Sequence, residues 1–84
     1  MSKRYRGIWK LAAGDVTELM FFKKVRWVSK GATVGDQCIL KDNNGEVLFE
    51  SVAVYVNWQD SFDLNRLVVI TVTTLSSGTL YLYE

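Results

Sequence analysis

Apolar and polar residues alternate with a period of two along most of the chain, and no long segment shows the 3.6-residue period of a helix. Residues 5–12 alternate in this way and predict one half-buried strand. Residues 16–22 fit either a strand or a short helical turn. Residues 24–28 alternate cations with Val25 and Trp27, and loop residues 29–32 end that strand.

The second half of the chain predicts further strands. Residues 35–53 are interpreted as a hairpin that turns at Asp42–Gly45, because Asn and Gly tolerate the positive φ angles of tight turns. Residues 57–66 are predicted to be a loop with helical-turn potential. The β-branched run 67–75 predicts an unbroken core strand, and 79–83 predicts the last strand, with Leu80 and Leu82 on one face.

These patterns predict the fold class. Short strands with turn signals about every ten residues are typical of an all-β protein, here a compact antiparallel β-sandwich or small barrel of six to seven short strands. Eighty-four residues are enough for a single domain spanning 1–84. The chain contains no proline, so its strand edges must be protected by charge, closure or a neighbouring subunit.

Composition argues against a catalytic or metal centre. The chain has no histidine and a single cysteine, Cys38, which removes the usual nucleophile–base pairs and zinc ligands. Residues 42–46 superficially resemble a calcium loop, but apolar residues follow where further ligands are needed, which favours a plain turn. Asp60 and Asp63 are interpreted as solvated loop residues. We expect no enzyme activity, no catalytic residue, no cofactor and no metal.

The sequence also predicts the setting of the protein. No apolar run approaches the ~20 residues of a membrane span, so we expect neither a membrane segment nor a signal peptide. A lone thiol fits a reducing cytoplasm. The net charge of +1 is divided unevenly: residues 1–30 have eight basic and two acidic residues, and residues 31–84 have two basic and seven acidic residues. Such a chain suits an acidic partner or a second copy of itself.

Two basic stretches with interleaved aromatic residues, 3–6 and 21–27, are the clearest functional signal. Cations beside stacking rings are typical of small β-barrels that bind single-stranded nucleic acid. However, Trp27 alternates with the cations, so its ring can point inward, and a pI of about 7.8 is below the ~9 expected of a dedicated nucleic-acid binder. A nucleic-acid-binding barrel is therefore the alternative hypothesis, and a solvated or subunit-facing basic strand is favoured.

The order of several segments resembles the small all-β virion proteins of tailed bacteriophages. These segments are 25–32, 34–36, 40–48, 67–75 and 77–83, and from the first to the last the resemblance spans about two-thirds of the chain. Members of that group are structural proteins that decorate or cement capsids or belong to tails and fibres, commonly as symmetric oligomers without a cofactor. The resemblance rests on turns and strand pattern, so it transfers no binding residue.

The resemblance implies a non-enzymatic virion protein, made in the host cytoplasm, that binds the major capsid protein or another virion protein. It also implies a homo-oligomer, with a trimer favoured. A basic N-terminal region would face an acidic capsid surface, and aromatic residues would meet neighbouring subunits. Candidate partner-binding residues are Lys3, Arg4, Tyr5, Arg6, Trp9, Lys23, Lys24, Trp58, Tyr81 and Tyr83. For each tryptophan, a place in the core is the competing interpretation.

Overall fold

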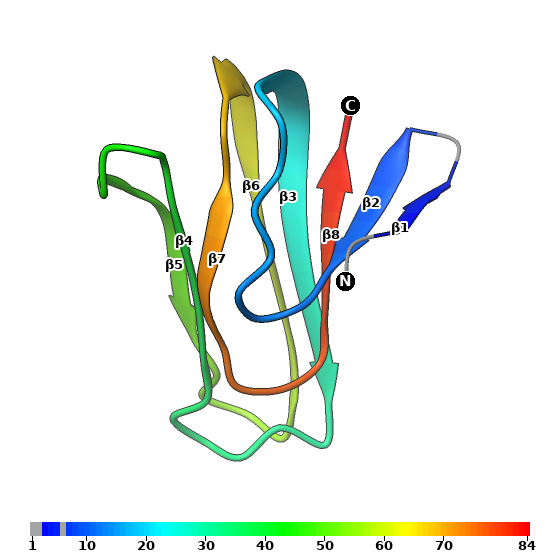
Figure 1. Ribbon diagram of the computed structural model, residues 1–84. Helices are drawn as coiled ribbons and strands as arrows, with labels where there is room; N and C mark the ends of the chain where they lie inside the picture. The colour runs from blue at the N-terminus through cyan, green and yellow to red at the C-terminus, as the bar shows by residue number, and fades with distance from the viewer. Residues whose placement is uncertain (1–2, 6) are drawn as a thin grey trace.

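The computed structural model describes the backbone of residues 3–5 and 7–84 and the side chains of residues 7–84 (Figure 1). It contains eight strands, β1 (Lys3–Tyr5), β2 (Ile8–Leu11), β3 (Met20–Lys30), β4 (Gln37–Lys41), β5 (Val47–Val52), β6 (Asn57–Val68), β7 (Thr71–Leu75) and β8 (Thr79–Tyr83). All pairings are antiparallel, and the described residues include no helix. The predicted all-β fold class is confirmed.

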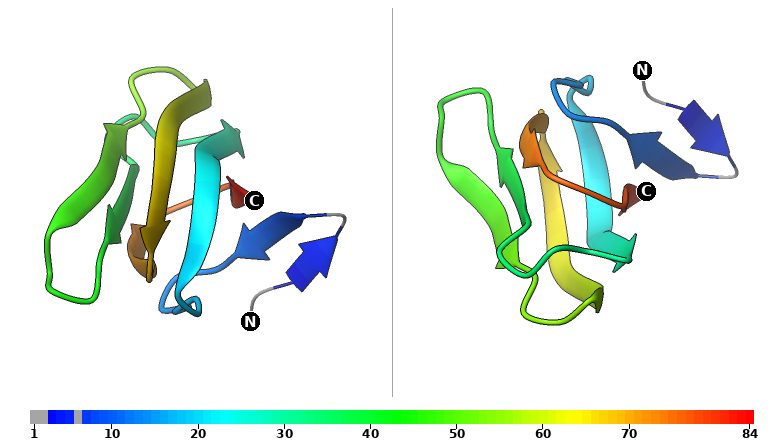
Figure 2. Two further views of the ribbon diagram at one scale, coloured as in Figure 1. Left: turned by 90° about the horizontal axis from the view of Figure 1, so that it is seen from above. Right: turned by 90° about the horizontal axis from the view of Figure 1, so that it is seen from below.

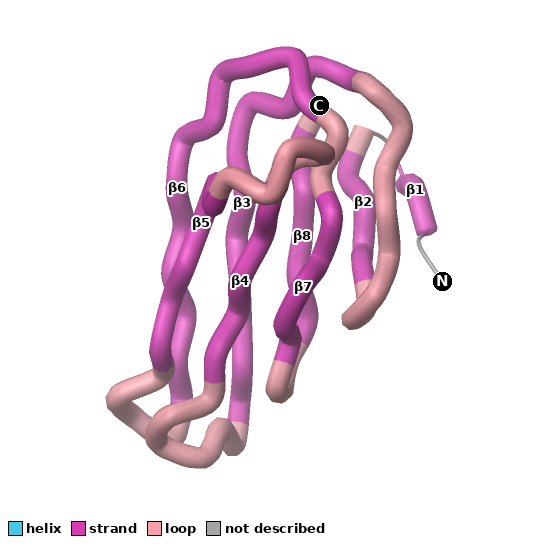
Figure 3. Tube along the Cα trace, turned by 60° about the vertical axis from the view of Figure 1, so that its left-hand side comes forward, coloured by secondary structure: helices cyan, strands magenta, loops and turns pink. Residues whose placement is uncertain are grey.

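The strands form two sheets that lie in two layers (Figure 3). The five-stranded sheet has the order β1-β2-β8-β3-β6, and the three-stranded sheet has the order β5-β4-β7. Seen along the strands, the β1–β2 hairpin extends sideways beyond the three-stranded sheet (Figure 2). The molecule is therefore a sandwich in which a smaller layer covers part of a larger one.

The core lies between the two layers and is built from both. Trp27, Val25, Leu80 and Leu82 of the large sheet are fully buried, and Leu40 of the small sheet meets them with no exposed surface. Burying an apolar side chain of this size contributes about 1.5–3 kcal/mol, so this shared layer holds the sheets together. Because side chains alternate along each strand, the residues next to these core residues face outward.

Two predicted elements occur where the sequence placed them. The β4–β5 hairpin turns at residues 42–45, where Asp42 Oδ1 accepts hydrogen bonds from the backbone amides of Asn44 (2.8 Å) and Glu46 (2.9 Å). Gly45 has φ of 83°, which favours glycine. Strand β8 spans Thr79–Tyr83 as predicted, with Leu80 and Leu82 buried.

The N-terminal prediction needs correction. Residues 5–12 do not form one strand, because the chain reverses near Gly7 (φ 76°) and β1 pairs back on β2. This extra reversal contributes to a total of eight strands where six or seven were predicted. In residues 16–22, where strand and turn were both open, Val16 makes an isolated bridge to Thr71, and strand β3 begins at Met20.

Two predictions for the second half are wrong. Residues 57–66 were expected to be a loop, but they belong to β6, the longest strand, because pairing with β3 supplies backbone hydrogen bonds that its polar sequence does not reveal. The run 67–75 is not one strand. It breaks after Val68, where the chain leaves the five-stranded sheet and enters the three-stranded sheet as β7.

The chain returns from β7 to β8 through a turn that packs tightly against β3. Trp27 Nε1 donates a hydrogen bond to the carbonyl oxygen of Ser77 (2.8 Å), and the hydroxyl groups of Ser29 and Ser77 lie 2.6 Å apart. Gly78 has φ of 77°, and a Cβ atom there would overlap the backbone oxygen of Val28 and lie 2.7 Å from Ser29 Cα. This turn therefore fixes β8 beside β3.

Candidate binding face

The outer face of the five-stranded sheet collects cations and tyrosines from three strands. Cross-strand partners lie on the same side of a sheet, and the register places Lys10 of β2 beside Tyr81 of β8 and Tyr81 beside Arg26 of β3. One step along, Tyr83 lies beside Lys24. We call this surface the cationic face, defined by Lys10, Lys24, Arg26, Lys30, Tyr81 and Tyr83.

Most partners of these cations are uncharged. Arg26 Nη2 donates a hydrogen bond to Gln59 Oε1 at 3.2 Å, and Lys10 Nζ lies 5.7 Å from the centre of the Tyr81 ring. Asp63 lies opposite Lys24 across β3 and β6, but within residues 7–84 no ion pair joins any of these four cations to a carboxylate. The cationic face therefore presents positive charge that its own side chains leave largely uncompensated.

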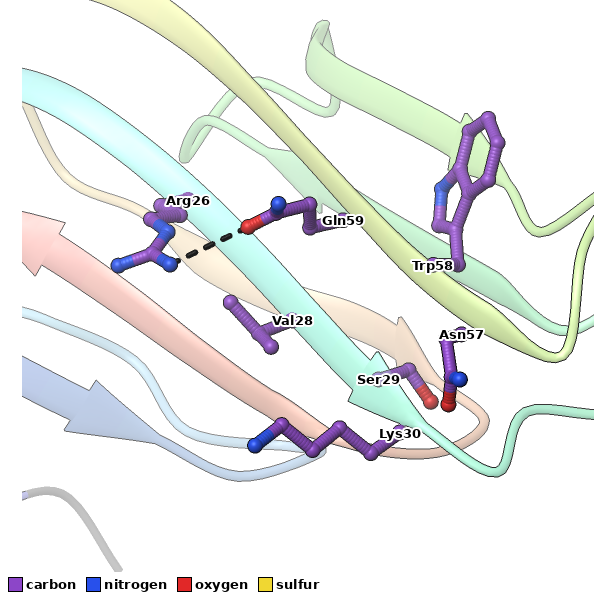
Figure 4. Close-up of a pocket in the computed structure, with 7 residues that line it drawn as sticks. All are labelled: Arg26, Val28, Ser29, Lys30, Asn57, Trp58 and Gln59. Carbon is purple, nitrogen blue, oxygen red and sulfur yellow. Dashed lines mark hydrogen bonds between the residues drawn. The ribbon is translucent and has the colours of Figure 1, made fainter.

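The described residues form open depressions on and beside this face. The one in Figure 4 has a volume of about 180 Å³ and is lined by Arg26, Val28, Ser29, Lys30, Asn57, Trp58 and Gln59. A second, of about 380 Å³, lies next to it around Lys24 and Arg26, and a third, of about 350 Å³, lies around Lys30 and Tyr81. Open hollows along a sheet suit an extended or convex partner better than an engulfed small molecule.

The structure brings together only part of the predicted partner-binding set. Lys24, Tyr81 and Tyr83 lie on the cationic face, and Lys23 is exposed at a bulge where β3 and β6 lose register. Trp9 and Trp58 lie on the inner side of the sheet and are partly buried against the core. Lys3, Arg4 and Tyr5 have a described backbone in β1, but their side chains, and Arg6 altogether, lie outside the described residues.

Trp27 belongs to the basic stretch 21–27, in which aromatic rings could contact a partner or point into the core. It is fully buried, so its ring belongs to the core, which was the competing interpretation. Its burial also explains the alternation in β3: Val25, Trp27 and Ser29 point inward while Lys24, Arg26 and Lys30 point outward.

Sequence reasoning missed Lys10 and Lys30, and it noted Arg26 without selecting it. Each alternates with an inward-facing residue of its strand, so the period-two pattern contained the signal that they point outward. What the pattern lacked was the strand order β2-β8-β3, which places Lys10 next to strands more than ten residues away in sequence.

The other candidate groups do not assemble into a reactive centre. Burial, with a smaller contribution from the charge of Asp60, raises the pKa of the Cys38 thiol from 9.0 to about 12, which keeps it protonated. Asp60 faces inward and accepts a hydrogen bond from Ser51 Oγ (2.8 Å), whereas Asp63 shares the outer side with Lys24. These two carboxylates therefore do not face each other.

The described part of the chain has neither a cluster of metal-ligating residues nor a helix that could span a membrane. Residues that could ligate a metal do not gather in groups of three or more there. No helix in that part of the chain has the length and apolar character needed to cross a bilayer.

Comparison with protein-family models, curated proteins and solved structures finds no match to this chain.

Proposed function

We propose that this protein is a non-enzymatic virion structural protein, in the manner of a capsid decoration protein, that attaches through its cationic face to an acidic surface of another virion protein. The observation that carries the proposal is the row of cations on one sheet face without carboxylate partners in residues 7–84. The resemblance to small bacteriophage virion proteins supplies the setting.

A sheet face suits this role physically. Its side chains stand on a paired backbone above a closed core, so the backbone loses little conformational entropy when a partner docks. Individual exposed ion pairs contribute only about 0.2–1 kcal/mol, so attachment depends on several acting together. Many copies on a symmetric particle would then bind by multivalency.

The arrangement of the tyrosines favours an acidic protein over single-stranded nucleic acid. Stacking a base needs an open aromatic ring face, and Lys10 lies over the Tyr81 ring. Tyr83 is half-buried between its neighbours on β2 and β3. In addition, the pI of about 7.8 is low for a protein that binds phosphate backbones.

The decisive experiment measures attachment to particles encoded by the same genome as this chain. Particles lacking the protein are incubated with the purified chain and sedimented at low and at high salt. We expect binding at low salt that weakens as salt screens the contact, and a clear loss of binding in the variant Lys10→Gln/Arg26→Gln. The matched control is Lys41→Gln/Arg66→Gln, which removes the same number of cations from other parts of the molecule and is expected to bind nearly like the parent.

Three results would contradict the proposal. They are absence of binding by the parent chain at low salt, equal loss in the control variant, and tighter binding to a single-stranded oligonucleotide than to particles. The last result would favour the nucleic-acid alternative. The predicted trimer is not tested by this experiment and stays a prediction.

A further inference from the structure

Strand β6 is a long edge that the rest of the chain leaves open. It has 12 residues and pairs only with β3. Its stretch 57–63 keeps regular register with residues 24–30 of β3, so every second residue directs its backbone N–H and C=O groups away from the sheet. In residues 7–84, no backbone–backbone hydrogen bond links positions 58–67 to any strand other than β3. The backbone amide of Ser61 donates a local hydrogen bond to Asp60 Oδ1 (2.8 Å), so at this position pairing with another strand would exchange one hydrogen bond for another.

The other edges are treated differently. Residues 14–17 cover the edge of β7, with hydrogen bonds from Gly14 N to Val72 O, Val72 N to Asp15 O, and Thr17 N to Ile70 O, each 2.9 Å. Strand β1 has three residues, and β5 has six with Glu50 near its middle. Among the strands of the described residues, β6 alone offers a long regular edge, and open edges of this kind pair readily with another strand.

An exposed aromatic ring lies on the same edge. Phe62 is 51% exposed although it lies on the inner side of β6, opposite the fully buried Val25 of β3. Its ring centre is 6.5 Å from that of Phe49 in β5, so it caps the core at a side that the small sheet does not close. A strand added beside β6 would cover this ring.

We infer that β6 pairs antiparallel with β6 of a second copy of this chain, around a two-fold axis at Ser61 or Phe62. This inference concerns the chain alone and does not depend on the acidic partner proposed above. It differs from the predicted trimer, because an isologous edge contact closes with two subunits.

Charge selects the position of the axis. Residues opposite each other in an antiparallel pair share a face, so an axis at Asp60 or Asp63 would place that carboxylate opposite its own copy, which is unfavourable. An axis at Ser61 places Asp60 opposite Phe62 and Asp63 opposite Gln59. An axis at Phe62 places Asp60 opposite Leu64 and Asp63 opposite Ser61. Both arrangements avoid opposed carboxylates and cover Phe62 with the second copy.

Pairing at this edge would also join the two cationic faces. The two-fold axis stands perpendicular to the extended sheet, so the outer faces of both copies lie on one side. The dimer would present twice the number of cations to one partner surface, which raises avidity without a new kind of contact.

The first test is sedimentation of the intact chain from 1 to 200 µM. We expect a monomer–dimer equilibrium, and we expect Ser61→Asp to raise the dimer dissociation constant at least about tenfold. The introduced carboxylate lies opposite its own copy when the axis is at Ser61, and opposite Asp63 of the second copy when the axis is at Phe62. Ser61 is exposed and outward-facing, so this variant should fold. The control Asn43→Asp adds the same charge in the β4–β5 turn and should dimerise like the parent. A monomer throughout the range, a trimer, or equal weakening by the control would overturn the inference.

The second test is cross-linking by oxidation of single-cysteine additions. Either Ser61→Cys or Phe62→Cys should form a covalent dimer, because the residue at the axis faces its own copy, whereas Gln59→Cys should not. The native Cys38 is fully buried and gives the background in the parent chain. Equal cross-linking at all three positions, or none at Ser61 and Phe62, would contradict β6 pairing whatever the particle experiment shows.

Discussion

The outer faces of the two sheets differ in charge although both arise from strands of period two. The five-stranded sheet presents Lys10, Lys24, Arg26 and Lys30, with Asp63 at its margin. The three-stranded sheet presents Ile39 at its centre between Glu50 and Thr74, with Lys41 and Thr71 further along. One face is strongly positive, and the other is close to neutral.

The two layers therefore contribute differently to stability and to surface charge. Both sheets give their inner residues to one core, so both are needed for stability. Among the described residues, the larger sheet has the outer face with a strong excess of one charge sign, and the proposed binding depends on that face. Substitutions of inner residues should therefore lower the free energy of unfolding, whereas substitutions on the cationic face should weaken the proposed binding and leave stability nearly unchanged.

The largest effect on stability is expected in the turn between β7 of the small sheet and β8 of the large sheet. Gly78→Ala adds a Cβ atom against the backbone of Val28 and Ser29 at a positive φ, so we expect the free energy of unfolding to fall by more than about 3 kcal/mol. Chemical denaturation followed by tryptophan fluorescence measures this. Gly31→Ala is the control, because Gly31 also has a positive φ but no atom lies within 4 Å of the added Cβ position. This substitution should lower the free energy of unfolding by about 1 kcal/mol. Equal effects would show that the close approach at Gly78 is unimportant.

The next effect separates the inner and outer sides of the small sheet. Leu40→Ala removes a fully buried side chain and should lower the free energy of unfolding by about 3 kcal/mol, through lost burial and the cavity left behind. The neighbouring Ile39→Ala, on the half-buried outer side, should cost less than about 1.5 kcal/mol. Similar costs at both positions in denaturation experiments would show that the outer side of this sheet is covered, for example by another subunit.

A smaller effect appears in alkaline solution. The pKa of Cys38 is about 12 when folded, above the 9.0 of a free thiol, so the unfolded chain loses this proton first as pH rises. The parent should therefore lose stability between about pH 9 and 12, by up to about 1.4 kcal/mol per pH unit from this group. Cys38→Ala should show a flatter decline over that window, although it is less stable at pH 7. Parallel curves for the two proteins would contradict the buried, protonated thiol.

The smallest effect on stability is expected on the cationic face. Lys24→Gln/Arg26→Gln/Lys30→Gln should change the free energy of unfolding by less than about 1 kcal/mol, because these side chains form no ion pairs within residues 7–84. Thermal unfolding at low and high salt would measure it. A large loss of stability would mean that these cations hold the sheet together, which would remove the contrast between the two layers.

Elements whose residues interact locally could be predicted from the sequence. The β4–β5 hairpin depends on Asp42 and Gly45 within one turn, and β8 depends on the alternation of Leu80 and Leu82 with outward residues. The inward position of Trp27 and the buried thiol of Cys38 also follow from alternation. These features could be predicted because turn geometry and side-chain alternation act over a few residues.

The remaining features depend on packing between elements whose interacting residues are distant in sequence. Residues 57–66 look like a loop because only one edge of β6 is paired and its polar side chains reach solvent, and β3 converts them into a strand. The break after Val68 exists because the chain there changes from one sheet to the other. The cationic face needs the order β2-β8-β3, which arises when Leu11, Leu80 and Trp27 bury their side chains in one core. Packing, rather than any local pattern, therefore assembled the candidate site.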